Sequence, residues 1–537
     1  MENAKRYILG VIMLLALIQG CYEDEGNYDY SPLPSIQING MNTIYHPRRL
    51  LDSLIIPITV ETEYASSDLK YTWFIFNSGK VDYISAVEVD TIGREKDLSY
   101  LVSEEPGNYI LTVKVENTAN QYAVYASASV RVESEFSRGF YILKETPDGN
   151  SDLDFSSDSL EMARDIFVSM KGEALKGKPL LLAQLMNTPY VDPNSQERTK
   201  GHVLGITTEE SVCLLRTSDL VTVHDEESMF YGVEEEHPRR LARGFFRTMY
   251  FSENSVYSVR ANTNGSGIMG VPDTIRGASK WAVYDRQKMG FMYWDELNGR
   301  FLFVNSNGVV SVYENNASSY QPNGIKDKML YMGMLYNTAN TSFKNVAYAV
   351  FESSGGERKL YKLKHGGTTN PVQEVQVFAG NTNFARATTY AVCASNTPMI
   401  YYVTDGVLYA YSLTNNIEVP VSVPGLQAGE TVYYVANKYW RPYGGDYTKD
   451  YLVIGTTGGN NDYTLRLFNM VGGVPQGNSL PEYQFSGNGK VVDLQYIAST
   501  FTENMIVRGA TGGGPVIPDC VISLGCPWGS RGNKNAL

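Results

Sequence analysis

The sequence predicts an all-β protein in which a β-sandwich precedes a β-propeller-like domain. Three observations support this fold class. The chain is rich in Tyr (39 residues) and Gly (49 residues), which suit half-buried strands and tight turns. Short strands with period-two alternation fill residues 35–135. Apolar and aromatic runs then recur over residues 136–508, and several precede the Asn-Gly or Asp-Gly pairs of two-residue hairpins.

The first 20 residues read as an export signal that ends at a cysteine. Lys5 and Arg6 precede an apolar run, Ile8–Ile18, which is too short to span a bilayer because a spanning helix needs about 20 residues. The Ile-Gln-Gly-Cys segment that ends at Cys21 resembles a bacterial lipobox, in which the cysteine is diacylated and the peptide is cut before it. We therefore expect lipidation of Cys21; the alternative is a secreted protein cut near Gly20, with an ordinary thiol at Cys21.

Residues 21–34 read as a lipidated acidic tether. Glu23, Asp24 and Glu25 follow the cysteine almost directly. Such a run of charges is usually a solvated segment. Acidic residues at this place also resemble the signal of Bacteroidetes lipoproteins that are flipped to the outer leaflet. The resemblance implies an outer-membrane protein that is lipid-anchored and faces the cell exterior.

The sequence of residues 35–135 predicts the β-sandwich, because short strands follow one another with polar turns between them. Two motifs stand out, the Tyr-Thr-Trp that ends at Trp73 and the Pro-Gly-Asn-Tyr that ends at Tyr109. They resemble those of an immunoglobulin-like PKD domain, in which the tryptophan fills the core and the tyrosine points inward. The aspartates usual around that tryptophan are not evident, so the domain resembles a divergent, PKD-like member.

Residues 136–508 predict the propeller-like domain. Seven apolar and aromatic runs recur with starts 44 to 62 residues apart: Phe140–Leu143, His202–Ile206, Phe246–Tyr250, Phe291–Trp294, Val346–Phe351, Met399–Val403 and Tyr451–Ile454. Repeats of about 40–50 residues with four strands each are typical of propeller blades. We expect about seven blades, while six or eight also fit the spacing, and a set of stacked sandwiches is the alternative. Val491–Ile497 and Met505–Val507 would close the ring against the first run.

Two further segments complete the chain. Asp158–Lys171 has apolar residues at helical spacing and predicts an amphipathic helix. Residues 509–537 are Gly-rich and aperiodic, so we expect a disordered tail. An exported chain could bridge Cys520 and Cys526 in that tail, but one pair does not decide this. Cys213 and Cys393 read as buried small hydrophobes.

Charge and motifs exclude several classes of function. With 45 basic and 58 acidic residues the net charge is −13, which argues against binding nucleic acid. No zincin, nucleophile-elbow or P-loop motif is present, and no two of the five histidines have ligand spacing. Asp148–Asp154 resembles the start of a calcium loop, but Leu153 replaces its glycine and Ser159 its glutamate. The sequence therefore predicts no catalytic residue, metal or cofactor, and it favours a protein that is not an enzyme.

One aromatic stretch is the main candidate for binding. It joins Tyr, Trp and Arg side chains to a Gly/Pro-rich segment, a make-up typical of binding surfaces. The alternative is that these rings pack between blades. The candidate residues for ligand or partner binding are Tyr439, Trp440, Arg441, Tyr443 and Tyr447, with Trp281 of the segment Arg276–Arg286 as a weaker candidate.

The pattern of anchor, PKD-like domain and propeller-like region resembles the PKD-like lipoprotein family of Bacteroidetes. That resemblance implies a partner, a SusC/SusD-type importer, and a glycan or oligopeptide ligand. Our first hypothesis is a non-catalytic protein that binds or presents nutrient to the importer. The second is a propeller hydrolase or lyase acting on a surface polymer, which paired carboxylates or a histidine on the propeller axis would favour. The third is a structural subunit of the importer, which the lack of a pocket would favour.

Overall fold

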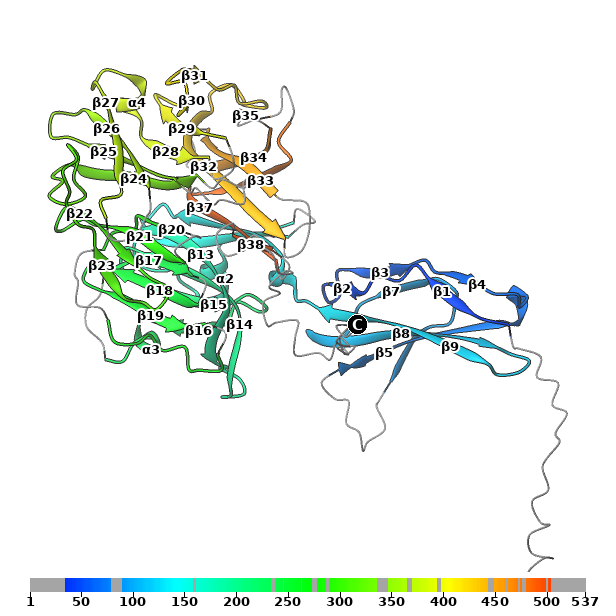
Figure 1. Cartoon of the computed structure of the whole chain (residues 1–537). Helices are drawn as coiled ribbons and strands as arrows, with labels where there is room; N and C mark the ends of the chain where they lie inside the picture. Colours follow the sequence, from blue (N-terminus) through cyan, green and yellow to red (C-terminus); the bar gives the residue numbers. More distant parts are fainter. Residues whose placement is uncertain are drawn as a thin grey trace, which may run out of the picture. The chain divides into compact units, whose positions relative to one another are not determined.

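The computed structural model divides the chain into two compact units, unit 1 up to Val132 and unit 2 from Glu133 onward. Both units consist mainly of β-strands (Figure 1). The residues that the structure describes are 34–503 except 79–88, 158–160, 233–236, 245, 262, 273–277, 286–288, 336–345, 365–368, 394–396, 443–448, 459–461, 472–473, 476–479 and 499–500.

Unit 1 is a small β-sandwich. Its largest sheet has the strand order β2-β9-β8-β5-β6, with β2 parallel to β9 and the other pairs antiparallel; β3 pairs with β7 and β1 with β4. The strands are β1 (Gln37–Asn39), β2 (Ile44–Tyr45), β3 (Ser53–Ile56), β4 (Thr59–Glu61), β5 (Leu69–Asn77), β6 (Asp90–Gly93), β7 (Leu98–Leu101), β8 (Gly107–Asn117) and β9 (Ala123–Val132), with a 3-10 turn at Ser66–Asp68.

Trp73 lies at the centre of the sandwich core, as its PKD-like motif predicts. It is fully buried, and its indole Nε1 donates a hydrogen bond to the backbone oxygen of Glu95 at 3.0 Å. Tyr109 packs against the same core, and its hydroxyl donates to the backbone oxygen of Glu105 at 2.9 Å. A tryptophan that is buried with its N–H satisfied contributes a large apolar area at no polar cost.

The described residues of unit 2 form seven sheets (Figure 1). The first four sheets, in spatial order, contain β12 (Met162–Ala163), β11 (Ser151–Ser157), β10 (Gly139–Glu145) and β37 (Lys490–Ile497); β13 (Pro179–Val191), β14 (Arg198–Thr208), β15 (Val212–Arg216) and β16 (Thr222–Asp225); β17 (Pro238–Arg243), β18 (Arg247–Ser252) and β19 (Val256–Arg260); and β20 (Ala282–Asp285), β21 (Gly290–Asp295), β22 (Arg300–Val304) and β23 (Val310–Val312).

The remaining sheets follow in chain order. They contain β24 (Lys328–Leu335), β25 (Val346–Glu352), β26 (Arg358–Lys364) and β27 (Val372–Phe378); β28 (Thr389–Val392), β29 (Met399–Thr404), β30 (Val407–Ser412) and β31 (Glu418–Pro420); and β35 (Val474–Pro475), β34 (Asp462–Val471), β33 (Lys449–Thr457), β32 (Thr431–Pro442) and β38 (Phe501–Glu503), with β36 (Tyr483–Asn488) beside β34. An all-β chain with a propeller-like second unit is thereby confirmed.

Each of the seven predicted runs lies in or overlaps one strand that has a sheet neighbour on both sides. We call this strand the second strand of its sheet: β10, β14, β18, β21, β25, β29 and β33. These strands carry continuous apolar runs because sheets pack against both of their faces. The hairpin prediction at Asp405-Gly406 is also confirmed, since both residues have positive φ (52° and 76°) and join β29 to β30. Such angles match the right-handed twist of the flanking strands.

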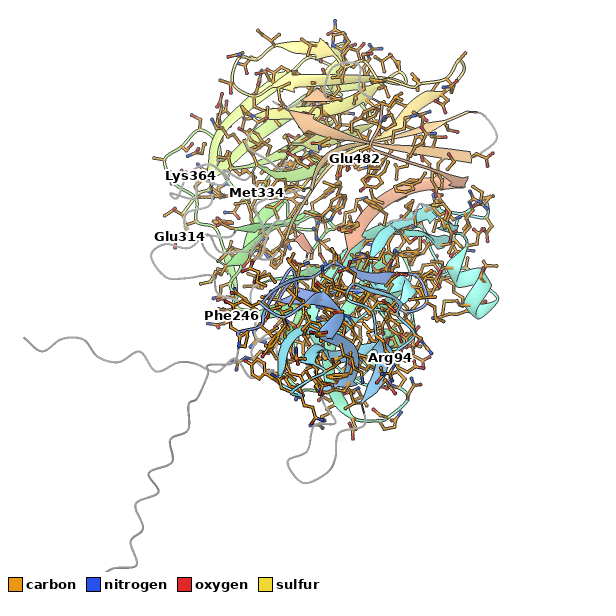
Figure 2. The ribbon with its side chains drawn as sticks, turned by 90° about the vertical axis from the view of Figure 1, so that its right-hand side faces the viewer. Arg94, Phe246, Glu314, Met334, Lys364 and Glu482 are labelled. Atoms are coloured by element: carbon orange, nitrogen blue, oxygen red, sulfur yellow. The ribbon has the colours of Figure 1, made fainter. Side chains whose placement is uncertain are left out.

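The sheets form a closed ring. Seven apolar clusters each join two successive sheets, and the last cluster joins the seventh sheet to the first. Met334 is buried in one of them, whereas Glu314 and Lys364 are exposed (Figure 2). Closure comes from β37, which pairs antiparallel with β10 so that Phe140 lies opposite Tyr496. The prediction that Val491–Ile497 closes the ring is confirmed, while Met505–Val507 falls outside the described residues.

Around most of the ring, one strand of each sheet contacts its counterpart in the next sheet, and we call these strands the inner strands: β37, β13, β17, β20, β24, β28 and β32. In six sheets the inner strand is the first strand of its sheet in the chain and is antiparallel to the second strand. In the remaining sheet β37 is likewise antiparallel to the second strand, β10, so it runs in the same direction as the other inner strands. All inner strands therefore begin at one face of the ring, which we call the entry face.

The helices among the described residues are short, and the predicted helix over Asp158–Lys171 is largely wrong. Helix α2 covers only Ile166–Lys171, because Met162–Ala163 pairs with β11 and Asp165 has a φ of 50° that no right-handed helix accepts. The other short helices are α3 (Glu226–Met229), α4 (Asn383–Arg386) and a 3-10 turn at Glu135–Ser137. Within the described residues, none is long and apolar enough to cross a membrane. The predicted tail, 509–537, lies outside the described residues.

Trp440 belongs to the ring closure and not to an exposed loop, so the prediction that it lies on the surface is wrong. It is a residue of β32 with no exposed surface, in the cluster that joins the last sheet to the first. Its ring lies 6.1 Å from that of Phe140 and 5.9 Å from that of Tyr496, centroid to centroid. Its Nε1 donates to Oε1 of Gln495 at 3.3 Å. The alternative of packing between blades is the one observed.

We predict that Trp440→Ala lowers the free energy of unfolding by about 3–5 kcal/mol, because it leaves a cavity at the closure. Chemical denaturation followed by circular dichroism measures this. Tyr231→Ala is the matched control, since Tyr231 is 78% exposed and its loss should be nearly neutral. A loss of less than about 1 kcal/mol for Trp440→Ala would contradict its place in the core.

Candidate functional site at the ring closure

An open cleft of about 390 Å³ lies beside the closing strand. Its lining comes from β10 and the turn after it, from β32, from the end of β33 and from the start of β37. Because Lys490 is the first residue of one inner strand and Tyr433 the third of another, the cleft opens at the entry face. The lining residues are Glu145, Thr146, Pro147, Tyr433, Thr457, Gly489 and Lys490.

Gly489 allows the two edges of this cleft to approach each other. It has a φ of 88°, and a Cβ placed on it would lie 2.4 Å from the backbone oxygen of Glu145. Only glycine fits such a contact in a left-handed conformation. The turn therefore packs directly on β10, and Glu145 and Lys490 become direct neighbours across the strand pair. A carboxylate and an ammonium thus share one rim of the cleft.

Tyr433 supplies the aromatic wall. Its hydroxyl accepts a hydrogen bond from the backbone N–H of Val491 at 2.9 Å, and Lys490 Nζ lies 5.5 Å from its ring centroid. Burial raises the pKa of Tyr433 well above its usual value, so the hydroxyl stays neutral. The ring is held in place before any ligand arrives, and the cation over it adds a favourable electrostatic contact.

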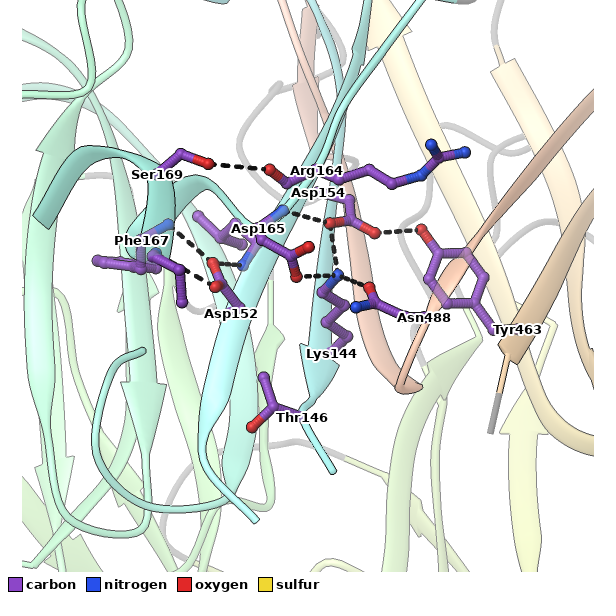
Figure 3. Close-up of polar contacts among 12 residues, drawn as sticks. Lys144, Thr146, Asp152, Asp154, Arg164, Asp165, Phe167, Ser169, Tyr463 and Asn488 are labelled. Carbon is purple, nitrogen blue, oxygen red and sulfur yellow. Dashed lines mark hydrogen bonds and ion pairs between the residues drawn. The ribbon is translucent and has the colours of Figure 1, made fainter. Parts of the chain in front are cut away.

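A buried ionic network around Lys144 lies next to the turn that carries Gly489 (Figure 3). Lys144 Nζ lies 2.7 Å from Oδ1 of Asp154 and 2.7 Å from Oδ1 of Asp165, and it also donates to the side-chain oxygen of Asn488. Lys144 and Asp154 have no exposed surface. The ammonium thus connects β10 and β11 to the turn that carries Gly489, which fixes the position of that turn.

The two buried aspartates here, Asp154 and Asp152, each accept several hydrogen bonds. Asp154 Oδ2 accepts from the hydroxyl of Tyr463 at 2.7 Å, and its Oδ1 accepts from the backbone N–H of Asp165 at 2.9 Å. Asp152 Oδ1 accepts from the backbone N–H of Phe167 at 2.8 Å. Burial raises the pKa of Asp152, and the N–H donors oppose that shift. These carboxylates therefore position the backbone.

Two of the aspartates just described, Asp152 and Asp154, belong to the segment that resembles the start of a calcium loop. Asp148 lies in the turn between β10 and β11, whereas Asp152 and Asp154 belong to β11 and point to different partners. Among the described residues, no group of three or more His, Cys, Asp or Glu side chains could hold a metal ion.

The predicted binding residues do not gather at the cleft. Tyr439 is 9% exposed and, like Trp440, lies in β32. Arg441 also lies in β32, opposite Thr502 of β38, and Tyr443 and Tyr447 fall outside the described residues. Trp281 is half-buried and lies edge-on to Tyr331, with ring centroids 5.6 Å apart.

Sequence reasoning missed the cleft because its two halves come from opposite ends of unit 2. Glu145 and Lys490 are separated by most of the ring, and only the pairing of β10 with β37 brings them together. One sequence feature points to the position of the cleft: the Asn-Gly pair that ends at Gly489, which predicts a tight turn before the closing strand.

The fold and cleft define an all-β protein with a PKD-like first unit and a propeller-like second unit. Residues 21–179 match the model of the PKD-like family. No curated protein matches the chain.

Several solved structures are similar in architecture. A quinonprotein alcohol dehydrogenase-like protein from Bacteroides thetaiotaomicron shares 12% identity with a TM-score of 0.35, over 84% of this chain and 98% of that chain. An apocarotenoid oxygenase from Synechocystis shares 8% identity with a TM-score of 0.31, over 82% and 97%. A putative exported protein from Bacteroides fragilis shares 10% identity with a TM-score of 0.27, over 51% and 83%.

We predict that Lys144→Met lowers the free energy of unfolding by about 3–5 kcal/mol, because it leaves buried carboxylates without their cation. Denaturant titration measures the change. Adding Asp154→Asn to the same variant should restore part of the loss. The control is Arg386→Met, which breaks the exposed pair with Asp405 and should cost at most about 1 kcal/mol. Equal effects of the two single variants would contradict a structural role for the network.

Proposed function

We propose that this protein is a non-catalytic surface lipoprotein that binds or presents a glycan or oligopeptide to a SusC/SusD-type importer. The observation that carries the proposal is the cleft at the ring closure. Its wall is an aromatic ring fixed by a backbone N–H, and its rim holds a cation and a carboxylate. Rigid aromatic and charged groups on regular strands form the kind of site that holds a polar ligand with little loss of side-chain entropy.

The composition of the cleft favours binding over hydrolysis. Glycoside hydrolysis ordinarily needs two carboxyl groups about 5–9.5 Å apart across the scissile bond. Glu145 is the one carboxylate among the residues that line the cleft. Asp148, in the turn after Pro147, accepts hydrogen bonds from Thr146 and Asn150, while Asp154 and Asp165 are engaged with Lys144. A ligand that enters the cleft therefore meets groups that can orient it.

The placement at the cell surface is supported by the sequence alone. The short apolar run before Cys21 and the acidic residues after it resemble an exported lipoprotein. Two acyl chains give stable anchoring, where one gives only marginal membrane binding. A ligand-binding ring on such an anchor would sit where an importer receives its nutrient.

We predict that Lys490→Met weakens ligand binding by roughly tenfold, equivalent to about 1.4 kcal/mol, because the cation leaves the rim of the cleft. The ligand is first chosen by screening the mature chain on glycan and peptide arrays, and titration calorimetry then gives the affinity. Lys326→Met is the control, since Lys326 is an exposed lysine that does not line the cleft. Unchanged affinity in Lys490→Met would exclude the cleft as the binding site.

We also predict that added protease removes the protein from intact cells, because the body faces outward. Cys21→Ala should release it into the soluble fraction, since the acyl chains are then absent. Cys213→Ala is the control, because this buried thiol lies in unit 2 and should not affect anchoring. Retention of the Cys21→Ala protein on membranes would contradict lipid anchoring. Co-purification of an importer channel tests the partner.

A further inference from the structure

A second group of polar residues lies at the centre of the entry face. Each member but one lies within the first few residues of an inner strand or directly before it. The exception is Lys438, which lies farther along β32 and whose side chain reaches Asp493. Together they come from five different sheets. We call this group the axial cluster: Arg240, Lys280, Trp281, Tyr331, Lys438 and Asp493.

Asp493 is fully engaged within the protein. Its Oδ1 accepts from Lys438 Nζ at 2.7 Å and from the backbone N–H of Leu494 at 2.8 Å. Its Oδ2 accepts from the backbone N–H of Leu182 at 2.9 Å. These bonds join the inner strands β32, β37 and β13. Asp493 is thus already paired with one cation, Lys438, and it lies beyond ion-pairing distance of Lys280.

Lys280 has no such partner. With the described residues, its ammonium forms no hydrogen bond or ion pair, and it lies over the ring of Trp281 at 5.1 Å from the centroid. Burial lowers the pKa of Lys280, and Arg239 adds to that effect, while Glu209, Asp493 and Glu296 oppose it from beyond ion-pairing distance. Part of the side chain is still accessible.

The axial cluster itself has a positive formal charge although the chain is acidic. Arg240 donates from Nη1 to the backbone oxygen of Lys280 at 3.2 Å, which brings a second cation close to the first. The cluster contains three cations, Arg240, Lys280 and Lys438, and one carboxylate, Asp493, which gives a formal charge of +2 in a chain of net −13. A partly desolvated cation without a counterion costs free energy that an anionic ligand would recover.

Aromatic rings border this cation. Trp281 and Tyr331 meet edge-on, and the Tyr331 hydroxyl is fixed because it accepts from the backbone N–H of Val392 at 2.8 Å. Flat apolar rings beside a charge suit the C–H faces of a sugar that carries an acid group, whereas an extended peptide would need backbone partners. We propose that the axial cluster binds the carboxylate of an acidic glycan, through Lys280 and Arg240, with Trp281 against the sugar ring. This inference rests on the proposed binding function.

The test uses trigalacturonic acid as the anionic probe and maltotriose as the neutral probe, with titration calorimetry on the full mature chain. Lys280→Met should weaken binding of the acidic probe at least tenfold. It should not lower the melting temperature, because it removes a poorly solvated charge. Lys280→Arg should retain much of the binding. Binding of the acidic probe should fall with added salt, as expected for a charge pair.

The two lysine variants separate this inference from the proposed function. If Lys490→Met weakens every ligand while Lys280→Met weakens none, the cleft binds ligand and the axial inference is overturned. A preference for acidic peptides over trigalacturonic acid also overturns it. If no ligand on the glycan and peptide arrays binds, the accessibility of Lys280 to chemical modification tests the inference directly. Mass spectrometry then follows acetylation of Lys280 with and without millimolar probe, and unaltered acetylation overturns the inference, whereas protection supports it.

Discussion

The pairing of β37 with β10 is the constraint on which unit 2 depends, because it converts a row of sheets into a ring. Two ion pairs lie at this junction: Lys144 with Asp154, which is fully buried, and Lys438 with Asp493, in which the lysine is partly exposed. Buried ion pairs are often no more stabilising than apolar residues of similar size, because desolvation offsets their attraction. The pair of Lys438 with Asp493 also favours one register, because a slip of one residue would move every side chain of β37 to the other face and separate Asp493 from Lys438.

The same junction produces the candidate site. Because β37 returns from the end of the unit, its first residue enters beside the last residue of β10, and the glycine turn before it must pack on backbone. That packing leaves Tyr433 facing a cleft whose rim carries both charges. The network of Lys144 holds the turn without entering the cleft, so stability and binding are assigned to different side chains. A site of this kind needs little rearrangement when a ligand binds.

The sequence predicted the fold well because the second strand of each sheet is buried on both faces and reads as an unbroken apolar run. Strands such as β21 and β29 are of this kind, and hairpin pairs such as Asp405-Gly406 mark their ends. Several inner strands have a weaker signal, because polar residues interrupt them, such as Arg239 and Arg240 in β17 and Asp493 in β37. Trp440 was misplaced for a related reason: a Gly/Pro-rich neighbourhood suggested a loop, while the partner that buries its indole, Gln495, comes from the closing strand.

Apart from Trp281, which the sequence predicted as a weaker binding candidate, the residues of the cleft and of the axial cluster were beyond sequence reasoning, because each group combines residues from distant sheets. The axial cluster also shows that net charge can conceal local charge. At physiological salt, charges more than about 8–10 Å apart are largely screened, so the acidic surface neither strongly repels an anionic ligand nor neutralises the cations at the axis. A local cationic centre in an acidic protein therefore contributes selectivity at contact range more than it accelerates encounter. If the axis carries this selectivity and the cleft supplies contact area, a single face of the ring can hold a long ligand at two separate points, and the combined affinity exceeds that of either point alone.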